Sequence, residues 1–181
     1  PEAVYAAFLP WVMGSVAVPL HPLLSEEELR HVLADSGARV ILTTQRWYGR
    51  DYPAMLARLL PELPNLRHVV VVGLEEGDGR VFLPLREVMA PGESLPRVRV
   101  SAHDASYIFY TSGTTGQPKG VVHTFGSTWN VARGIDIRLS TIRAVRCLLL
   151  PFPLHHYAGL FGVTAALVAG GKVVLMDRPN P

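Results

Sequence analysis

The chain has 181 residues, of which 49% are hydrophobic, and its 17 basic and 15 acidic side chains leave a formal net charge of +2. This length and composition allow a sizeable hydrophobic core, in one large domain or a small pair of domains. The near balance of charge, without a basic run or interleaved aromatic and basic residues, argues against a nucleic-acid-binding protein. The single cysteine, Cys147, excludes an internal disulfide and a metal site built from several cysteines.

The first half of the chain alternates between helical and strand patterns. A helix is expected over 2–13, apolar on nearly all sides and therefore buried, with Pro10 ending or kinking it. Ser25 with Glu28 three positions later forms a capping box, so a second helix should begin there and stop at Gly37. Further strands are expected over 16–20, 39–43 and 69–72, and further helices over 51–60 and 84–90. This alternation predicts a layered α/β fold with a largely parallel sheet.

The second half follows a linker over 91–105 that is rich in Pro, Gly and Ser. Two strands are expected within 106–123, on either side of an irregular loop, and glycines within 125–138 suggest a helix with a break. The remaining expected elements are a strand over 146–150, a helix over 156–169 and a strand over 172–176. The chain thus divides into a first α/β part over 1–90 and a second part over 106–181.

Residues 147–171 contain no Asp, Glu, Lys or Arg and could be mistaken for a membrane span. A span needs about 20 predominantly apolar residues, whereas two prolines and two histidines interrupt this stretch. A buried helix is therefore expected, and Cys147, in an apolar strand-like run, is expected to be a buried and inert thiol. Neither an integral membrane segment nor a signal peptide is visible, and a cytoplasmic location is compatible with these features.

The most informative segment is 110–120, Tyr-Thr-Ser-Gly-Thr-Thr-Gly-Gln-Pro-Lys-Gly. Glycine is costly in helices and strands and Pro118 lacks an N–H. Glycines do, however, let backbone N–H groups converge on an anion, while hydroxyls add donors and Lys119 adds positive charge, which indicates a triphosphate-binding loop. The Walker pattern does not fit, because counting from Gly113 puts Pro118 at the second glycine and Gly120 at the Ser/Thr position. An incidental surface turn is the alternative.

Position by position, Ile108 to Lys119 resembles the signature loop of the AMP-forming superfamily of acyl- and aryl-CoA synthetases, luciferases and peptide-synthetase adenylation domains. Members of that superfamily activate carboxylic acids with ATP. The resemblance implies that Lys119 is catalytic and that the Thr111 hydroxyl reaches Mg²⁺. The residues implied to bind the phosphates of ATP are Thr111, Ser112, Gly113, Thr114, Thr115, Gly116 and Lys119. A weaker resemblance over 14–44 concerns the scaffold alone.

A second segment, Pro-Leu-His-His-Tyr-Ala-Gly over 153–159, is similar to the superfamily's P-L-x-H-x-x-G motif. By register, the resemblance implies that His156 is the catalytic histidine, the one that in the superfamily closes on the acyl pocket and the nucleotide. His155 stands where relatives often carry an aromatic residue, so either imidazole could face the pocket. Without the resemblance, a histidine pair beside an apolar helix more often has a packing role. His123 has two interpretations, as a residue that relatives share or as a histidine at the edge of the core.

The resemblance implies that a carboxylic acid and ATP give an acyl-adenylate, which a thiol, most plausibly that of CoA, converts to a thioester. A carrier-protein thiol is the alternative acceptor. Two other classes also stay open: a non-catalytic nucleotide-binding module, and an interaction domain with an incidental loop. The superfamily's adenine, ribose, hinge and C-terminal lysine motifs do not occur in this sequence. The chain is therefore expected to be part of an N-terminal domain, inactive alone, with exposed apolar surface and a tendency to form homo-oligomers.

Overall fold

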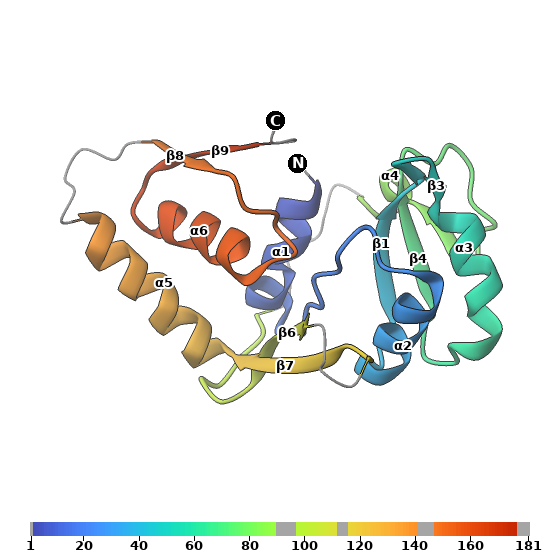
Figure 1. Ribbon diagram of the computed structural model, residues 1–181, viewed down its shortest axis with the longest axis horizontal. Coiled ribbons are helices and arrows are strands. Elements are labelled where there is room, and N and C mark those ends of the chain that lie inside the picture. The colour runs from blue at the N-terminus through green and yellow to red at the C-terminus, as the bar shows by residue number, and fades with distance from the viewer. Residues whose placement is uncertain (1, 90–96, 112–115, 141–146, 177–181) are drawn as a thin grey trace.

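The computed structural model of this chain describes residues 2–89, 97–111, 116–140 and 147–176, with the backbone alone described over 135–140. Its elements form two groups that lie side by side (Figure 1). Both groups contain helices packed on parallel strand pairs, and an antiparallel hairpin belongs to the second group. This arrangement confirms the predicted α/β class.

A three-stranded parallel sheet organises the first group. Its strands, β1 (Val40–Thr44), β4 (His68–Val72) and β5 (Phe82–Pro84), lie in the order β1-β4-β5. The valine run of β4 occupies the central position, where a strand covered on both faces is expected to be continuously apolar. The other elements of this group are α2 (Glu26–Ser36), β2 (Arg46–Trp47), β3 (Arg50–Asp51), α3 (Tyr52–Leu59), the 3₁₀ turn η1 (Leu60–Glu62) and α4 (Leu85–Val88).

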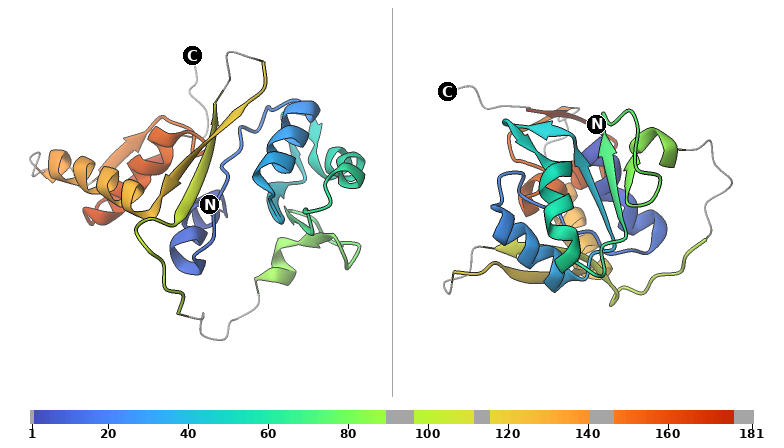
Figure 2. Two further views of the ribbon diagram at one scale, coloured as in Figure 1. Left: turned by 90° about the horizontal axis from the view of Figure 1, so that it is seen from below. Right: turned by 90° about the vertical axis from the view of Figure 1, so that its right-hand side faces the viewer.

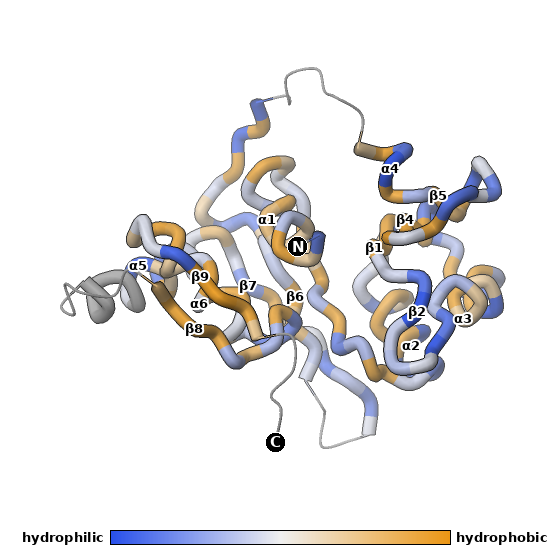
Figure 3. The backbone as a smooth tube through the Cα atoms, turned by 90° about the horizontal axis from the view of Figure 1, so that it is seen from above, coloured by the Kyte–Doolittle hydropathy of each residue, from blue (hydrophilic) through white to orange (hydrophobic). Residues whose placement is uncertain are grey.

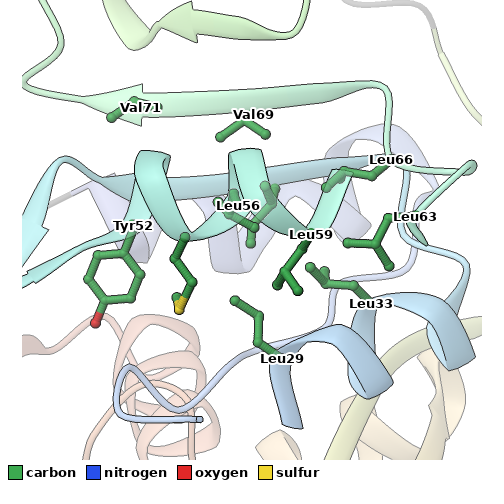
Figure 4. Close-up of a cluster of buried hydrophobic side chains, with 11 residues drawn as sticks. Leu29, Leu33, Tyr52, Leu56, Leu59, Leu63, Leu66, Val69 and Val71 are labelled. Atoms are coloured by element: carbon green, nitrogen blue, oxygen red, sulfur yellow. The ribbon is translucent and has the colours of Figure 1, made fainter. Parts of the chain in front are cut away.

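Helices α2 and α3 fill the space over this sheet. Figure 4 shows Leu56 and Leu59 of α3 between the strands and Leu29 of α2. Leu56 and Val69 are completely buried, and burying a side chain of this size is worth about 1.5–3 kcal/mol. The cluster of buried residues is Leu29, Leu33, Ile41, Tyr52, Met55, Leu56, Leu59, Leu63, Leu66, Val69 and Val71.

Helix α2 begins and ends where its sequence predicts. The Ser25 hydroxyl accepts a 3.2 Å hydrogen bond from the Glu28 N–H, and the Glu28 carboxylate accepts a 2.7 Å bond from the Ser25 N–H. Gly37 ends the helix with φ of 62°, in the left-handed region that glycine adopts without strain. The start and end of α2 are therefore fixed by local chemistry.

The second group is built around the hairpin of β6 (Ala105–Thr111) and β7 (Lys119–Thr124), whose antiparallel pairing confirms the predicted strand–loop–strand arrangement. Helix α6 (Tyr157–Val168) packs on it with eight consecutive buried residues, 159–166, as expected for a buried helix. Tyr107 and Phe109 of β6 meet Leu160 and Phe161 of α6 in the core of this group. Its other elements are α1 (Glu2–Met13), α5 (Phe125–Ser140), β8 (Cys147–Leu150) and β9 (Lys172–Leu175).

Two expectations for the N-terminal segment are wrong. Helix α1 covers the expected residues, 2–13, with Pro10 inside it, but it is not buried on all sides as expected, since Tyr5 is 72% exposed. Residues 16–20 form no strand; Ala17 makes an isolated parallel bridge to Tyr107. Pro19 lacks an N–H and cannot continue a ladder of hydrogen bonds, which explains why the pairing stops there.

Two expectations for the second half are also wrong. Cys147 is exposed, because successive residues of β8 alternate in direction and Leu150 is the one that is buried. Helix α5 runs without a break through Gly126 and Gly134. Gly126 is explained by close packing, since a Cβ atom there would lie 2.9 Å from the carbonyl oxygen of Ala102.

None of the helices in the described ranges is both long enough and apolar enough to cross a bilayer.

The two glycines of α5 should respond in opposite ways to replacement by alanine. At Gly134 nothing lies within 4 Å of an added Cβ, so Gly134→Ala should stabilise the protein by about 0.5–1 kcal/mol through helix propensity. Gly126→Ala should cost about 1–3 kcal/mol, because the new atom meets backbone that must move. Urea unfolding of both variants measures the difference. Equal effects at the two sites would contradict the packing described for Gly126.

Candidate functional site

The predicted phosphate loop connects the two strands of the hairpin in sequence. Thr111 and Lys119 are register partners at the ends of β6 and β7, and both are exposed. The ladder therefore places a hydroxyl and an ammonium group at the base of the loop. Among the described residues no carboxylate forms an ion pair with Lys119. Four of the predicted phosphate-binding residues lie outside the described residues: Ser112, Gly113, Thr114 and Thr115.

Two glycines in this region meet specific steric requirements. Gly116 has φ of 89°, a conformation that a side chain would strain. A Cβ on Gly120 would lie 3.1 Å from Cζ of Tyr110 and 2.9 Å from Cγ2 of Ile108. The absence of a side chain at 120 thus lets the Tyr110 ring lie across β7.

Helix α2 lies against the base of the loop (Figure 1). The Tyr110 hydroxyl donates a 2.5 Å hydrogen bond to the Asp35 carboxylate, and Nε2 of His31 lies 3.0 Å from the carbonyl oxygen of Pro118. Burial, reinforced by the bond to Asp35, raises the pKa of Tyr110 above its usual value, so the phenol keeps its proton and acts as the donor. An open, shallow pocket of about 310 Å³ lies here, lined by His31, Asp35, Gln117, Pro118, Lys119 and Gly120.

His156, the predicted catalytic histidine, is the N-cap residue of α6. Its Nδ1 accepts a 3.2 Å hydrogen bond from the N–H of Ala158, and its side chain is exposed. In the neutral ring the proton therefore resides on Nε2, which is left as a donor. A further constraint is Gly159, where a Cβ would lie 2.0 Å from the carbonyl oxygen of Pro153. The 153–156 turn can therefore fold back on α6 only with glycine at this position.

His155 points elsewhere and packs on His21. The two ring centroids are 4.5 Å apart in an edge-to-face arrangement. Nδ1 of His21 accepts a 3.0 Å hydrogen bond from the N–H of Leu23. Burial first, and the neighbouring charges of His21 and His156 second, lower the pKa of His155 to about 4, so this ring is neutral at pH 7.

His123 joins the two motifs. It lies on β7, with its ring 4.9 Å from that of Tyr157 and 5.5 Å from that of Phe109. Burial lowers its pKa below the usual value. His123 therefore lies at the edge of the core of the second group. The contact with Tyr157, next to His156, brings the start of α6 against the hairpin that carries Lys119.

Metal binding by Thr111 would need ligands beyond those described. Within the ranges given above, no three His, Cys, Asp or Glu side chains are arranged to hold a metal ion. Sequence reasoning also missed three residues, His21, His31 and Asp35, that contact the predicted motifs. His31 and Asp35 are one turn apart on α2 and share a face, and this spacing could have been recognised in the sequence. Nothing in the sequence indicated that the hairpin would pack on this face.

Comparison with known proteins identifies the family. The model of the AMP-binding enzyme family matches residues 1–181, so the chain belongs to that family. This finding confirms the resemblance seen in the loop and in the histidine segment.

Particular relatives agree with this assignment. The chain is 30% identical over 178 residues to a 2-succinylbenzoate–CoA ligase of Bacillus velezensis, covering 98% of the chain and 32% of the relative. It is 32% identical over 170 residues to a long-chain-fatty-acid–CoA ligase of Mycobacterium tuberculosis, covering 92% of the chain and 31% of the relative. The O-succinylbenzoate coenzyme A synthetase structure from Bacillus subtilis, in complex with ATP and magnesium ion, superposes with a TM-score of 0.73 at 26% identity, covering 99% of this chain and 33% of that one. The chain thus spans about a third of the length of these proteins.

The low pKa of His155 predicts a loss of stability in mild acid. The unfolded chain, with an ordinary histidine pKa near 6.5, binds a proton that the folded protein resists down to about pH 4. The free energy of unfolding should therefore fall as the pH is lowered through this window. His155→Phe, which keeps an aromatic ring on His21, should flatten the fall, leaving a smaller slope from His123.

Urea midpoints at pH 7.5 and pH 5 test this expectation. His103→Phe is the control, because His103 is exposed. If His155→Phe keeps the full pH dependence of the unmodified protein, the ring is not held neutral by its surroundings.

Proposed function

We propose that this chain supplies the triphosphate-binding part of an enzyme that activates a carboxylic acid with ATP and passes the acyl group to a thiol. The observation that carries the proposal is the pairing of Thr111 with Lys119 at the base of the glycine-threonine loop. Membership of the AMP-binding enzyme family supports the adenylate-forming step. The loop composition supports the proposal that ATP is held there by its β- and γ-phosphates.

The proposed first reaction has a defined electrostatic problem. A carboxylate oxygen attacks the α-phosphorus, the bond to the bridging oxygen breaks, and pyrophosphate leaves with that electron pair. An anion approaches a polyanion, and further charge develops on the leaving group. Lys119 and the N–H groups of the loop would offset this repulsion, and each hydrogen bond to a charged group is worth about 1.5–3 kcal/mol.

Mg²⁺ would partly neutralise the same phosphates. Thr111 is the proposed contact, because its exposed side chain lies at the loop base opposite Lys119. The Bacillus subtilis structure, in complex with ATP and magnesium ion, supports an ion of this kind. The β6–β7 pairing would hold the Thr111 hydroxyl in a fixed position opposite Lys119.

We propose His156, rather than His155, as the histidine that faces the acyl pocket and the nucleotide. His155 is half-buried against His21, whereas His156 is exposed. Because Nδ1 of His156 caps α6, its Nε2–H is the group available to substrate. The capping bond also fixes the orientation of the ring.

CoA is the proposed thiol, and two of the relatives named above are CoA ligases. The names of these relatives give very different acids, 2-succinylbenzoate in one and long-chain fatty acids in the other. We therefore propose the substrate only by its class, a carboxylic acid. A carrier-protein thiol is the alternative acceptor. Assaying the full protein with ATP, CoA and acids from acetate to long-chain and aryl acids would identify both substrates.

The charge of Lys119 provides the central mutational test. In the full protein, Lys119→Ala should lower the rate of ATP–pyrophosphate exchange by about 10- to 150-fold, since one charged hydrogen bond is lost. Lys119→Arg should restore part of that rate. The only other lysine in the sequence, Lys172, is exposed at the start of β9 and gives the matched control, Lys172→Ala. Unchanged exchange and thioester formation in Lys119→Ala would contradict the proposed phosphate role.

The 181-residue chain alone should form no thioester and should self-associate. The β8–β9 pair is mostly hydrophobic in sequence, as the colours of Figure 3 show. Its exposed side chains include Leu149 (58% exposed) and Val174 (49%), and Phe152 (53%) lies just after β8. Exposed apolar patches of this kind mark surfaces that pack against another protein or another part of the same protein. Thioester assays and gel filtration of the isolated chain test both points. Efficient thioester synthesis by a monomer would contradict them.

A further inference from the structure

Helix α2 contacts both ends of the phosphate loop. On the incoming strand, Tyr110 directly precedes Thr111 and donates to Asp35 over 2.5 Å. On the outgoing strand, Pro118 directly precedes Lys119, and its carbonyl oxygen lies 3.0 Å from Nε2 of His31. A carbonyl can only accept, so His31 is the donor and carries its proton on Nε2.

These two contacts come from one face of one helix. His31 and Asp35 are a single turn apart and therefore project side by side. Helix α2 is itself anchored in the first group by Leu29 and Leu33, which belong to the buried cluster of that group and are at most 5% exposed. Because α2 contains neither glycine nor proline and is anchored in the core, it can act as a rigid support for the hairpin.

The hairpin is shaped to reach this support. Gly120 is the register partner of Tyr110, and a side chain there would crowd the Tyr110 ring. The Tyr110 ring can therefore lean across β7 toward Asp35. The contacts join residues 75 and 87 positions apart in sequence, so they link the second group of elements to the first. In Figure 2 the hairpin likewise extends toward α2, away from the rest of its own group.

We propose that Asp35 and His31 are positioning residues that fix the base of the phosphate loop on α2 and so aim Lys119 and Thr111 at the triphosphate. This inference rests on the proposed function of the loop. A loop whose two ends are held loses less conformational freedom when it binds ATP, so more of the binding energy is realised. Neither side chain needs to touch ATP for this effect.

The contacts of Tyr110 and Pro118 with α2 lie outside both hydrophobic clusters, so their loss should affect ATP binding more than the stability of the fold. In the full protein, Tyr110→Phe and Asp35→Ala should each raise the KM for ATP about 2- to 12-fold, the worth of one hydrogen bond. The KM for the acid and the melting temperature should change little. Because both variants break the same bond, the double variant should be no worse than the worse single variant.

Conservative replacements separate positioning from general damage. Asp35→Asn keeps an oxygen that can accept from Tyr110, and His31→Gln keeps an N–H donor, so both should recover part of the ATP affinity lost in Asp35→Ala and His31→Ala. Glu27→Gln is the control, because it changes the charge of an exposed residue on the same helix. Its kinetics should match those of the unmodified protein.

Lys119→Ala, assayed in parallel, distinguishes failure of this inference from failure of the proposed function. If Lys119→Ala lowers the exchange rate as expected while Tyr110→Phe and Asp35→Ala keep the normal KM for ATP, the proposed role of α2 is wrong and the phosphate role of Lys119 stands. The proposed role of α2 is also wrong if the increases in KM for ATP multiply in the double variant. It is equally wrong if these increases occur only together with a fall in melting temperature. If Lys119→Ala has no effect, both proposals fall.

Discussion

The antiparallel ladder between β6 and β7 is the interaction on which the candidate site depends. Its register sets Thr111 opposite Lys119, and no other contact among the described residues pairs these two groups. The ladder is itself held by the burial of Tyr107, whose hydroxyl donates to the Ala7 carbonyl over 2.6 Å and accepts from Trp11 over 3.0 Å. A phenol buried with both bonds made avoids the cost of an unpaired polar group. A shift of one residue would turn every side chain of the strand to the wrong face.

Both motifs meet at this hairpin. His123 of β7 touches Tyr157 at the start of α6, so the cap made by His156 is positioned by the strand that begins with Lys119. On the opposite side, His21, which precedes α2, packs on His155. The two imidazoles therefore have different roles in the fold: His155 joins the two groups of elements, and His156 caps α6 with an exposed side chain. This division gives a physical reason for the two adjacent histidines having different environments.

Local signals in the sequence were sufficient for much of the fold. The capping box of Ser25, the valine run of β4 and the strand–loop–strand pattern each depend on neighbours within a few residues, and each prediction is confirmed. The errors concern long-range packing. Residues 16–20 were expected to form a strand and Cys147 to be buried, and the contact of α2 with the hairpin could not be inferred from the sequence. For the site, the sequence indicated the residue types; only the fold could show that Asp35 and His31 lie beside Lys119.

The most decisive experiment is a structure of the full protein with a non-hydrolysable ATP analogue. We expect β- and γ-phosphate oxygens within hydrogen-bond distance, about 2.7–3.2 Å, of Nζ of Lys119. Tyr110 and Pro118 should keep their contacts with α2 in that complex. A triphosphate bound elsewhere, with the ammonium group of Lys119 left in solvent, would show that the hairpin does not bind ATP.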